Sequence, residues 1–281
     1  MTSPFRKPTS TPAEDAVDIE RYLDGVAAFF GGTANVIMQL SALPVGYGVL
    51  ESTVDSGKVM LHPIKRLRTT LTYLAVAMLG TDDERDLYRE AVNLSHHSVK
   101  STAASPVKYN AFDPALQLWV AACLYWGACD LYERMHRPMH DAEAFYRYGS
   151  RFGTTLQMRP EMWPADRAAF DEYWTEHLAK TTIDPPIRDY FNDLIDLKML
   201  PRAARIPFAR FQRFVVTGLL PEHLRDQMGM TWTADDDRKL ARIMHITGSI
   251  TARMPKQVRM FPINAYLWDM RIRRRFGLRL V

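Results

Sequence analysis

Several features that mark common enzyme classes are missing from the sequence. Only two of its 281 residues are cysteine, and both lie in one apolar segment, so no disulfide framework is expected and a reducing cytoplasm is the predicted location. No run of about 18 uncharged apolar residues is present, which predicts no membrane-spanning helix. The sequence also has no glycine-rich phosphate loop and no G-x-S-x-G motif, which argues against NTPases, nucleotide-fold dehydrogenases and α/β-hydrolases.

Alternating runs of the β-strand type are almost absent as well, and apolar residues recur at helical spacing. The pattern predicts an all-α fold, with a disordered leader over residues 1–12 and a single helical domain over residues 13–281. The expected helices are Ala13–Phe30, Thr33–Leu43, Pro44–Thr53, Ile64–Leu79, Asp82–Thr102, Pro114–Met135, Asp141–Gln157, Ala165–Lys180, Pro186–Ile195, Phe208–Thr217, Pro221–Gln227, Ala234–Arg253 and Ile263–Phe276.

Some helix starts carry recognisable sequence signals. Thr81 followed by Glu84 has the spacing of a capping box, and Asp113 before Pro114 combines a cap with proline at the first helical position. The segment that follows, residues 116–125, is apolar almost all round. It is therefore expected to be the central, fully buried helix.

Basic residues gather at the carboxyl end of the chain. From residue 251 onward there are eight Arg or Lys and one acid, whereas the first 250 residues hold the remaining 28 basic and 31 acidic residues. Such an end can contact phosphate, anionic lipid or an acidic cofactor, although a solvated helix is the ordinary alternative. No nucleic-acid partner is expected, because a helical repressor would carry these charges on an N-terminal helix-turn-helix.

Two helical segments place polar side chains where they could do chemistry. Arg66 and Thr70 lie one turn apart on one face, where they could hold a carboxylate or phosphate. The ordinary alternative is a surface arginine beside a threonine that bonds to its own helix.

A second stripe runs along the next helix. Tyr88, Val92, His96 and Val99 share one face that is apolar except for the histidine, whereas His97 falls on the polar side. An inward histidine is usually a hydrogen-bonded core residue. The alternative is an axial ligand to haem iron held between helices.

Over residues 31–275 the sequence resembles the superfamily of latex clearing proteins (rubber oxygenases) and MpaB-type oxygenases. The combination of R-x-x-x-T, then H-x-x-V and then Y-x-A-x-D-P is the specific part of the resemblance. The matching segments, in order, are GGTANVIMQLSALPVGYGVLES, RLRTTLTYLAVAMLGTDDE, HHSVKS, YNAFDPALQLWVAACLYWGACDLYE, GLLPEHLRDQMGMTW and MPKQVRMFP.

The resemblance implies a haem b (iron protoporphyrin IX) in a globin-like helical core. It assigns His96 as the proximal iron ligand, with Val99 in the same motif, and places Arg66 and Thr70 at the haem pocket. Glu51 corresponds in place to a glutamate proposed as a base in rubber oxygenases. Relatives use dioxygen to cleave or oxidise apolar, often isoprenoid, substrates.

At four positions the sequence departs from the family pattern: Leu43, Ser52, Thr69 and Ser101 stand where relatives often carry His, His, Lys and Gly. A remodelled distal pocket is therefore expected. The overall prediction is a haem-dependent oxygenase or oxidase that uses dioxygen or peroxide on an apolar, isoprenoid- or lipid-like small molecule. The alternative is a non-catalytic helical module that binds haem or lipid. Assembly into a homo-oligomer stays open.

Overall fold

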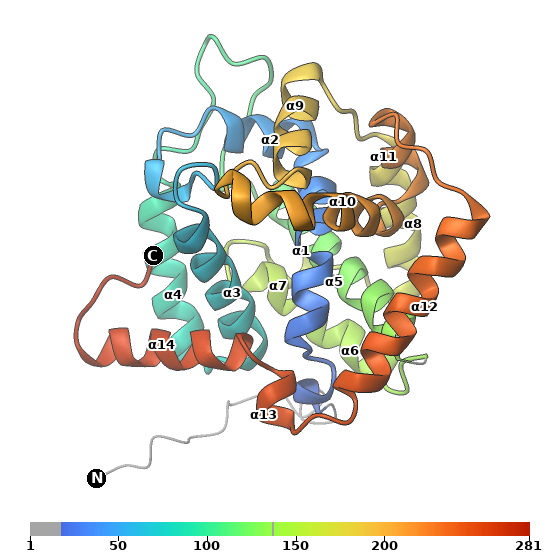
Figure 1. Ribbon diagram of the computed structural model, residues 1–281. Helices are drawn as coiled ribbons and strands as arrows, with labels where there is room; N and C mark the ends of the chain where they lie inside the picture. Colours follow the sequence, from blue (N-terminus) through green and yellow to red (C-terminus); the bar gives the residue numbers. More distant parts are fainter. Residues whose placement is uncertain (1–17, 137) are drawn as a thin grey trace.

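The structure is a computed structural model that describes residues 18–136 and 138–281, so the leader expected at residues 1–12 lies outside the described part. Helices account for its architecture (Figure 1). The α-helices are α1 (Gly25–Leu40), α2 (Leu43–Leu50), α3 (Pro63–Leu79), α4 (Asp82–His96), α5 (Pro114–Met135), α6 (Ala142–Gly149), α7 (Arg151–Thr154), α8 (Arg167–Ala179), α9 (Pro185–Ile195), α10 (Arg202–Leu219), α11 (Glu222–Gln227), α12 (Ala234–Thr251), α13 (Lys256–Arg259) and α14 (Ile263–Arg275). Short 3-10 helices cover Ile19–Arg21, Asp55–Gly57 and Pro160–Met162. Within the described ranges the only strand-like pairing is an isolated bridge between Lys100 and Asn110, so the all-α prediction is confirmed.

The helix starts that the sequence signalled are formed as expected. The Thr81 hydroxyl accepts the Glu84 amide while the Glu84 carboxylate accepts the Thr81 amide, which completes a capping box at the start of α4. Asp113 caps α5 by accepting the amide of Ala115. These caps satisfy backbone donors that the first helical turn leaves unpaired.

At the amino end of the domain the predicted helix boundaries were wrong. Residues 18–24 are not α-helical, and α1 runs unbroken through Gly31 and Gly32 instead of ending at Phe30. Gly31 serves close packing, because a Cβ there would lie 2.2 Å from a methyl carbon of Leu131 on α5. The helix break expected at Pro44 is present: α1 ends at Leu40, Pro44 sits in the first turn of α2, and α2 is bent by 107° from α1.

Other boundaries differ in the second half. The helix expected over Asp141–Gln157 is divided into α6 and α7 at Ser150. The helix expected from Phe208 begins at Arg202 and continues through Pro207, so this proline lies inside the helix and does not precede it. α13 was not predicted.

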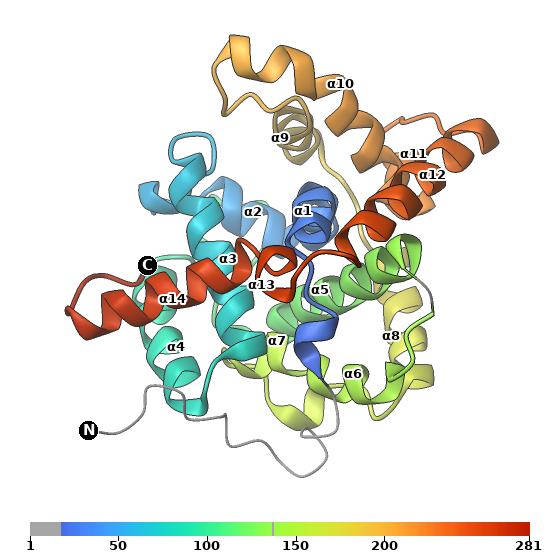
Figure 2. The same cartoon turned by 60° about the horizontal axis from the view of Figure 1, so that its bottom comes forward.

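α5 lies at the centre, as its sequence predicted, and its middle turns are buried. α1 and α12 pack against it (Figures 1 and 2). The contact with α12 is at backbone distance, since a Cβ at Gly248 would lie 1.7 Å from the carbonyl oxygen of Met135. On another side, the Trp174 ring of α8 stacks on Trp119 and Trp126 of α5 at centroid distances of 5.4 and 4.9 Å.

α14 crosses the pair formed by α3 and α4 (Figure 2). It buries Ile263, Leu267 and Met270 in a small apolar cluster with residues of both helices. Arg271 adds a two-pronged ion pair with Glu84 at the start of α4, at 2.7 and 3.1 Å. α14 is therefore fixed to the amino end of α4.

Among the described residues, no single helix has the length and apolar character needed to cross a membrane; α1 and α2 meet these criteria only when taken together as a bent pair. Cys123 and Cys129 are both free thiols. Location in the cytoplasm stays a prediction.

Candidate functional site

The site begins at the carboxyl end of α4. Tyr88 is fully buried and donates its hydroxyl to the carbonyl of Thr69, which orients this face of α4 toward α3. Two turns later, the Nδ1 atom of His96 is buried and has no hydrogen-bond partner among the described residues. His97 is exposed. The structure therefore has the inward and outward orientations predicted for the two histidines.

The electrostatic surroundings of His96 favour its neutral form. Burial of the ring, and then the charge of the nearby Arg66 guanidinium, lower the pKa of His96 to about 4. A neutral imidazole is the form that binds a metal ion. The half-buried imidazole is thus unprotonated at neutral pH, and its buried Nδ1 has no partner among the described residues.

Arg66 is both accessible and closely surrounded. Its side chain is exposed to solvent, yet desolvation by the surrounding protein lowers the pKa of Arg66, while the phenols of Tyr190 and Tyr88 act in the opposite direction. No ion pair or hydrogen bond to the Arg66 guanidinium is found in the described part of the chain, so a cation without a counter-charge stands close to His96.

The first two turns of α3 are unusually open around this arginine. No residue of α3 is buried before Leu71, and the apolar side chains of Ile64 and Leu67 are more than half exposed. Thr70, one turn after Arg66, is half-buried, and its hydroxyl makes no hydrogen bond to another described residue. Thr69 instead donates to the carbonyl of Arg66. This part of α3 offers a cation, a free hydroxyl and apolar surface.

Glu51 belongs to a different set of contacts. It ends α2, where its carboxylate accepts hydrogen bonds from Ser105 Oγ at 2.6 Å and from Tyr109 Oη at 2.7 Å. These two bonds lower the pKa of Glu51. Neither His96 nor Arg66 is among its partners, so the structure joins His96 with Arg66 and leaves Glu51 tied to the segment after α4.

That segment, residues 97–113, folds back on itself directly after His96. The Val99 amide donates to the His96 carbonyl at 2.9 Å, and the Val99 carbonyl accepts the amide of Ala111 at 3.0 Å. Ser101 and Tyr109 continue the pairing with a bond of 2.9 Å. Val99 is half-buried against the main core. The helix expected to reach Thr102 therefore ends at His96, because its next residues pair with a distant part of the chain.

A polar chain behind α4 was not foreseen from the sequence. Gln117 on α5 donates to Gln157 Oε1 at 2.6 Å, and Gln157 donates to Asn93 Oδ1 at 2.6 Å. Asn93 precedes His96 by one turn, so this chain fixes the helix end that carries the histidine. A buried glutamine in the otherwise apolar start of α5 was the available signal.

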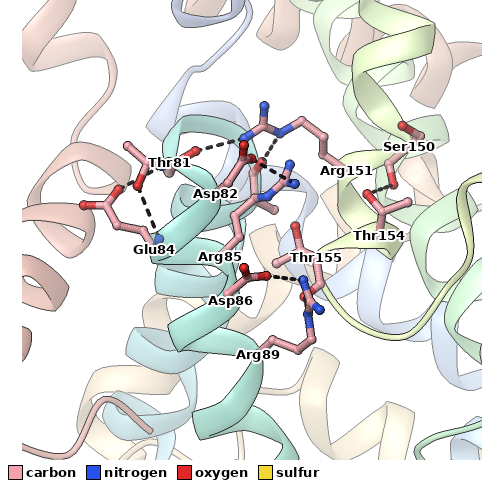
Figure 3. A network of polar contacts seen from close by, with 12 residues as sticks. Thr81, Asp82, Glu84, Arg85, Asp86, Arg89, Ser150, Arg151, Thr154 and Thr155 are labelled. Atoms are coloured by element: carbon pink, nitrogen blue, oxygen red, sulfur yellow. Dashed lines mark hydrogen bonds and ion pairs between the residues drawn. The ribbon is translucent and has the colours of Figure 1, made fainter. Parts of the chain in front are cut away.

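Two arginines tie the same helices to the region of α7, one at the end of α3 and one in the middle of α4 (Figure 3). Arg151, only 2% exposed, donates to the carbonyls of Ala77 and Gly80 at the end of α3, at 2.9 Å each. Arg89 of α4 donates to the carbonyl of Thr155 at 3.1 Å. Both contacts involve α7 or the residue that follows it. α3 and α4 therefore hold His96 and Arg66 in a fixed relation.

A single histidine, His96, suits a haem better than a metal ion that is held by protein side chains alone. The described residues contain no group of three or more His, Cys, Asp or Glu side chains that could hold a metal ion. A haem needs a single protein ligand on its proximal side, because the porphyrin supplies the other four. The contact between Arg271 of the basic α14 and Glu84 lies away from this centre, since Glu84 precedes His96 by twelve residues of helix, about 18 Å.

The fold and this pair of residues define an all-helical protein with a single-histidine site. A family model described as "ER-bound oxygenase mpaB/B'/Rubber oxygenase, catalytic domain" matches residues 19–249. The chain belongs to this oxygenase family, which confirms the resemblance.

Two curated relatives extend the comparison. An uncharacterised protein of Mycobacterium bovis and one of Mycobacterium tuberculosis are each 47% identical to the chain over 250 residues, covering 88% of this chain and 98% of theirs. No solved structure gives a significant match.

Proposed function

We propose that the chain is a haem b-dependent oxygenase or oxidase that acts on an apolar small molecule with dioxygen or peroxide. The family match supports oxygenase activity. The haem assignment depends on one observation: the half-buried, neutral His96, whose buried Nδ1 has no partner in the described structure, near an arginine without a counter-charge. Buried polar atoms are normally hydrogen-bonded, so the unpartnered nitrogen of a metal-binding side chain supports a ligand site here.

The residues present fit the proposed group. His96 would ligate the iron, and Arg66 would bind a carboxylate at the porphyrin edge. Val99, folded back over the carbonyl of His96, would fix the ring's approach. The bound haem would supply the redox-active iron that the oxidant requires.

The chain itself provides the surroundings of the reaction. The Thr70 hydroxyl, one turn from Arg66, is free to donate a hydrogen bond, while Ile64 and Leu67 present apolar surface on the same turns of α3. This surface supports an apolar substrate. Glu51 stays a proposed base: the hydrogen bonds from Ser105 and Tyr109 keep it ionised, so that it can accept a proton, but they also weaken it as a base.

The test is a comparison of two adjacent histidines. Purified protein titrated with hemin should develop a Soret band, which His96→Ala should abolish or displace. His97→Ala should leave the band unchanged, because His97 is exposed to solvent. Far-ultraviolet circular dichroism would establish that both variants are folded. Equal spectra in the two variants would remove His96 from the proposal.

The lowered pKa of Glu51 also favours the second candidate, a non-catalytic module that binds haem or lipid. Both candidates predict the same absorption band. They differ in turnover, since only an oxygenase consumes dioxygen when an isoprenoid or lipid-like substrate is added. Stable binding of hemin without oxygen consumption over a panel of apolar substrates would favour the module.

A further inference from the structure

The turn that follows α14 presents apolar side chains to solvent. Phe276 and Leu278 are 69% and 54% exposed, and Trp268 on α14 is 67% exposed. Trp268 and Arg275 are seven residues apart, two helical turns, and therefore share the face of α14 that points away from the core. We call Trp268 and residues 274–279 the C-terminal tip. It lies at the edge of the molecule in both views (Figures 1 and 2).

The tip is also strongly cationic. Arg274, Arg275 and Arg279 are all exposed, and none of them forms an ion pair with a described residue. The other two arginines of α14 are engaged, Arg271 with Glu84 at 2.7 Å and Arg273 with Asp269 at 2.7 Å. Three positive charges thus surround Phe276 and Leu278. None of them is in an ion pair with a described residue, although Arg274 is near enough to Glu84 to contribute to its lowered pKa.

The backbone holds these side chains outward in one conformation. Gly277 has φ +64°, a conformation that favours glycine, and it reverses the chain so that the Leu278 amide donates to the Arg273 carbonyl at 2.9 Å. The Arg273 guanidinium binds the carbonyl of Arg279 at 3.2 Å. Leu280 and Val281 then return to the small apolar cluster of α3, α4 and α14. The tip is a preformed turn and not a fraying end.

We propose that the C-terminal tip docks the protein on an anionic lipid surface. Exposed tryptophan and phenylalanine flanked by arginine suit the boundary between headgroups and acyl chains, where the rings insert and the guanidinium groups meet lipid phosphates. A nucleic acid would pair with the arginines but would leave Phe276 and Leu278 in water. The family match ends at residue 249 and so does not include α14. The inference does not depend on haem binding.

The experiment measures sedimentation of the full-length protein with vesicles. Vesicles of phosphatidylcholine with about 30% phosphatidylglycerol should bind the protein, and vesicles of phosphatidylcholine alone should bind it weakly. The triple variant Arg274→Gln, Arg275→Gln, Arg279→Gln should partition roughly a hundredfold more weakly, since each basic residue near such a surface contributes about 1 kcal/mol. The double variant Phe276→Ser, Leu278→Ser should also bind more weakly and lose the residual binding at high salt.

A second triple variant separates local docking from net charge. Arg147, Arg159 and Arg238 are exposed and lie elsewhere, each in a surface ion pair. Replacing all three with Gln changes the net charge equally and should leave vesicle binding within about twofold of the native protein. The proposal is overturned if the two triple variants weaken binding equally, if the native protein does not sediment with anionic vesicles, or if duplex DNA competes it off the vesicles through the same arginines.

Discussion

His96 and Arg66 each carry a polar group without a partner among the described residues: the buried Nδ1 of His96 and the solvent-accessible guanidinium of Arg66. In contrast, the buried Arg151 and the Gln117–Gln157–Asn93 chain use their hydrogen-bonding groups on neighbouring helices. Folding alone does not account for a buried imidazole nitrogen that is left without a hydrogen bond, because this costs free energy. A ligand that binds the imidazole and places a negative charge beside Arg66 is the simplest physical explanation.

The proposed role of Arg66 can be tested with a chemically altered ligand. Arg66→Leu should weaken hemin binding by about tenfold to a hundredfold, the range expected for a lost charge-assisted hydrogen bond. The same variant should bind the dimethyl ester of hemin as well as the native protein does, because the ester has no carboxylates. Absorption titrations with both ligands provide the measurement.

Arg68→Leu provides a matched control for this experiment, since it removes an arginine two residues away on another face of α3. It should change the two affinities by less than about threefold. Equal losses with hemin and its ester in Arg66→Leu would show that Arg66 acts through protein structure and not through the carboxylates.

For single residues, the sequence predicted the face of a helix on which each side chain lies, because that depends only on helical periodicity. The spacing of Tyr88, Val92 and His96 was enough to turn His96 inward, and the i, i+4 relation placed Thr70 on the face of Arg66. The partners of Glu51 were not predictable, because Ser105 and Tyr109 reach it through a loop whose path depends on tertiary contacts. The same holds for Gln157.

At the scale of helices, the arginines of α14 have two different roles: Arg271 holds the helix in place, and others are exposed at the surface. Burial alone raises the pKa of Glu84, but the hydrogen bonds and charge of Arg271 outweigh it, so the pKa lies below the usual value. The Glu84 side chain is 8% exposed and that of Arg271 39%. This half-exposed pair anchors α14 to α4, while Arg274 and Arg275, further along the helix, form no ion pair with a described residue.

The Glu84–Arg271 pair makes the free energy of unfolding depend on pH in a direction that can be stated. A carboxyl group whose pKa is lowered by folding stabilises the protein above its unfolded pKa of about 4.3, and the contribution disappears as the pH falls through the folded pKa. Arg271→Met should therefore cost about 2 kcal/mol of unfolding free energy at pH 7, less than for a fully buried pair because Arg271 is partly exposed. The difference from the native protein should shrink steadily below pH 4.

Urea unfolding of both proteins at pH 7 and pH 3.5 measures this difference. Arg273→Met is the control, because it breaks an i, i+4 pair within α14 that should contribute about 0.5 kcal/mol. A penalty for Arg271→Met that stays constant with pH would exclude Glu84 as the cause.

The sequence predicted the presence of most helices but was less successful in predicting the residues at which they begin and end. Caps such as Thr81 and Asp113 are local and were read correctly. The end of α4 was not, because residues after His96 pair with residues near 110, and no local signal marks that pairing. Gly31 and Pro207 were read as interruptions, although tertiary packing accommodates the glycine and the helix accommodates the proline.

For the whole molecule, the close approach of helices to α5 sets how tightly the domain is built. α12 crosses the end of α5 with no room for a side chain at Gly248, whereas Gly32 on α1 has no atom within 4 Å of the place where a Cβ would lie. Both glycines are helical. The same substitution should therefore have opposite effects at these two positions.

Gly248→Ala should lower the unfolding free energy by about 2–3 kcal/mol, because the new methyl group would overlap a backbone carbonyl that cannot move aside cheaply. Gly32→Ala should raise it by about 0.5–1 kcal/mol through better helix propensity. Thermal and urea unfolding of the two variants are the measurements. Equal and small effects would mean that α12 and α5 are further apart than the structure places them.

The stack of Trp119, Trp174 and Trp126 has a practical consequence of a different kind. Three indole rings held nearly parallel at about 5 Å keep their transition dipoles in one mutual orientation. Their coupled optical activity is thus a built-in reporter of the contact between α5 and α8, readable without any label. Trp268, isolated at the opposite surface, reports on solvent instead.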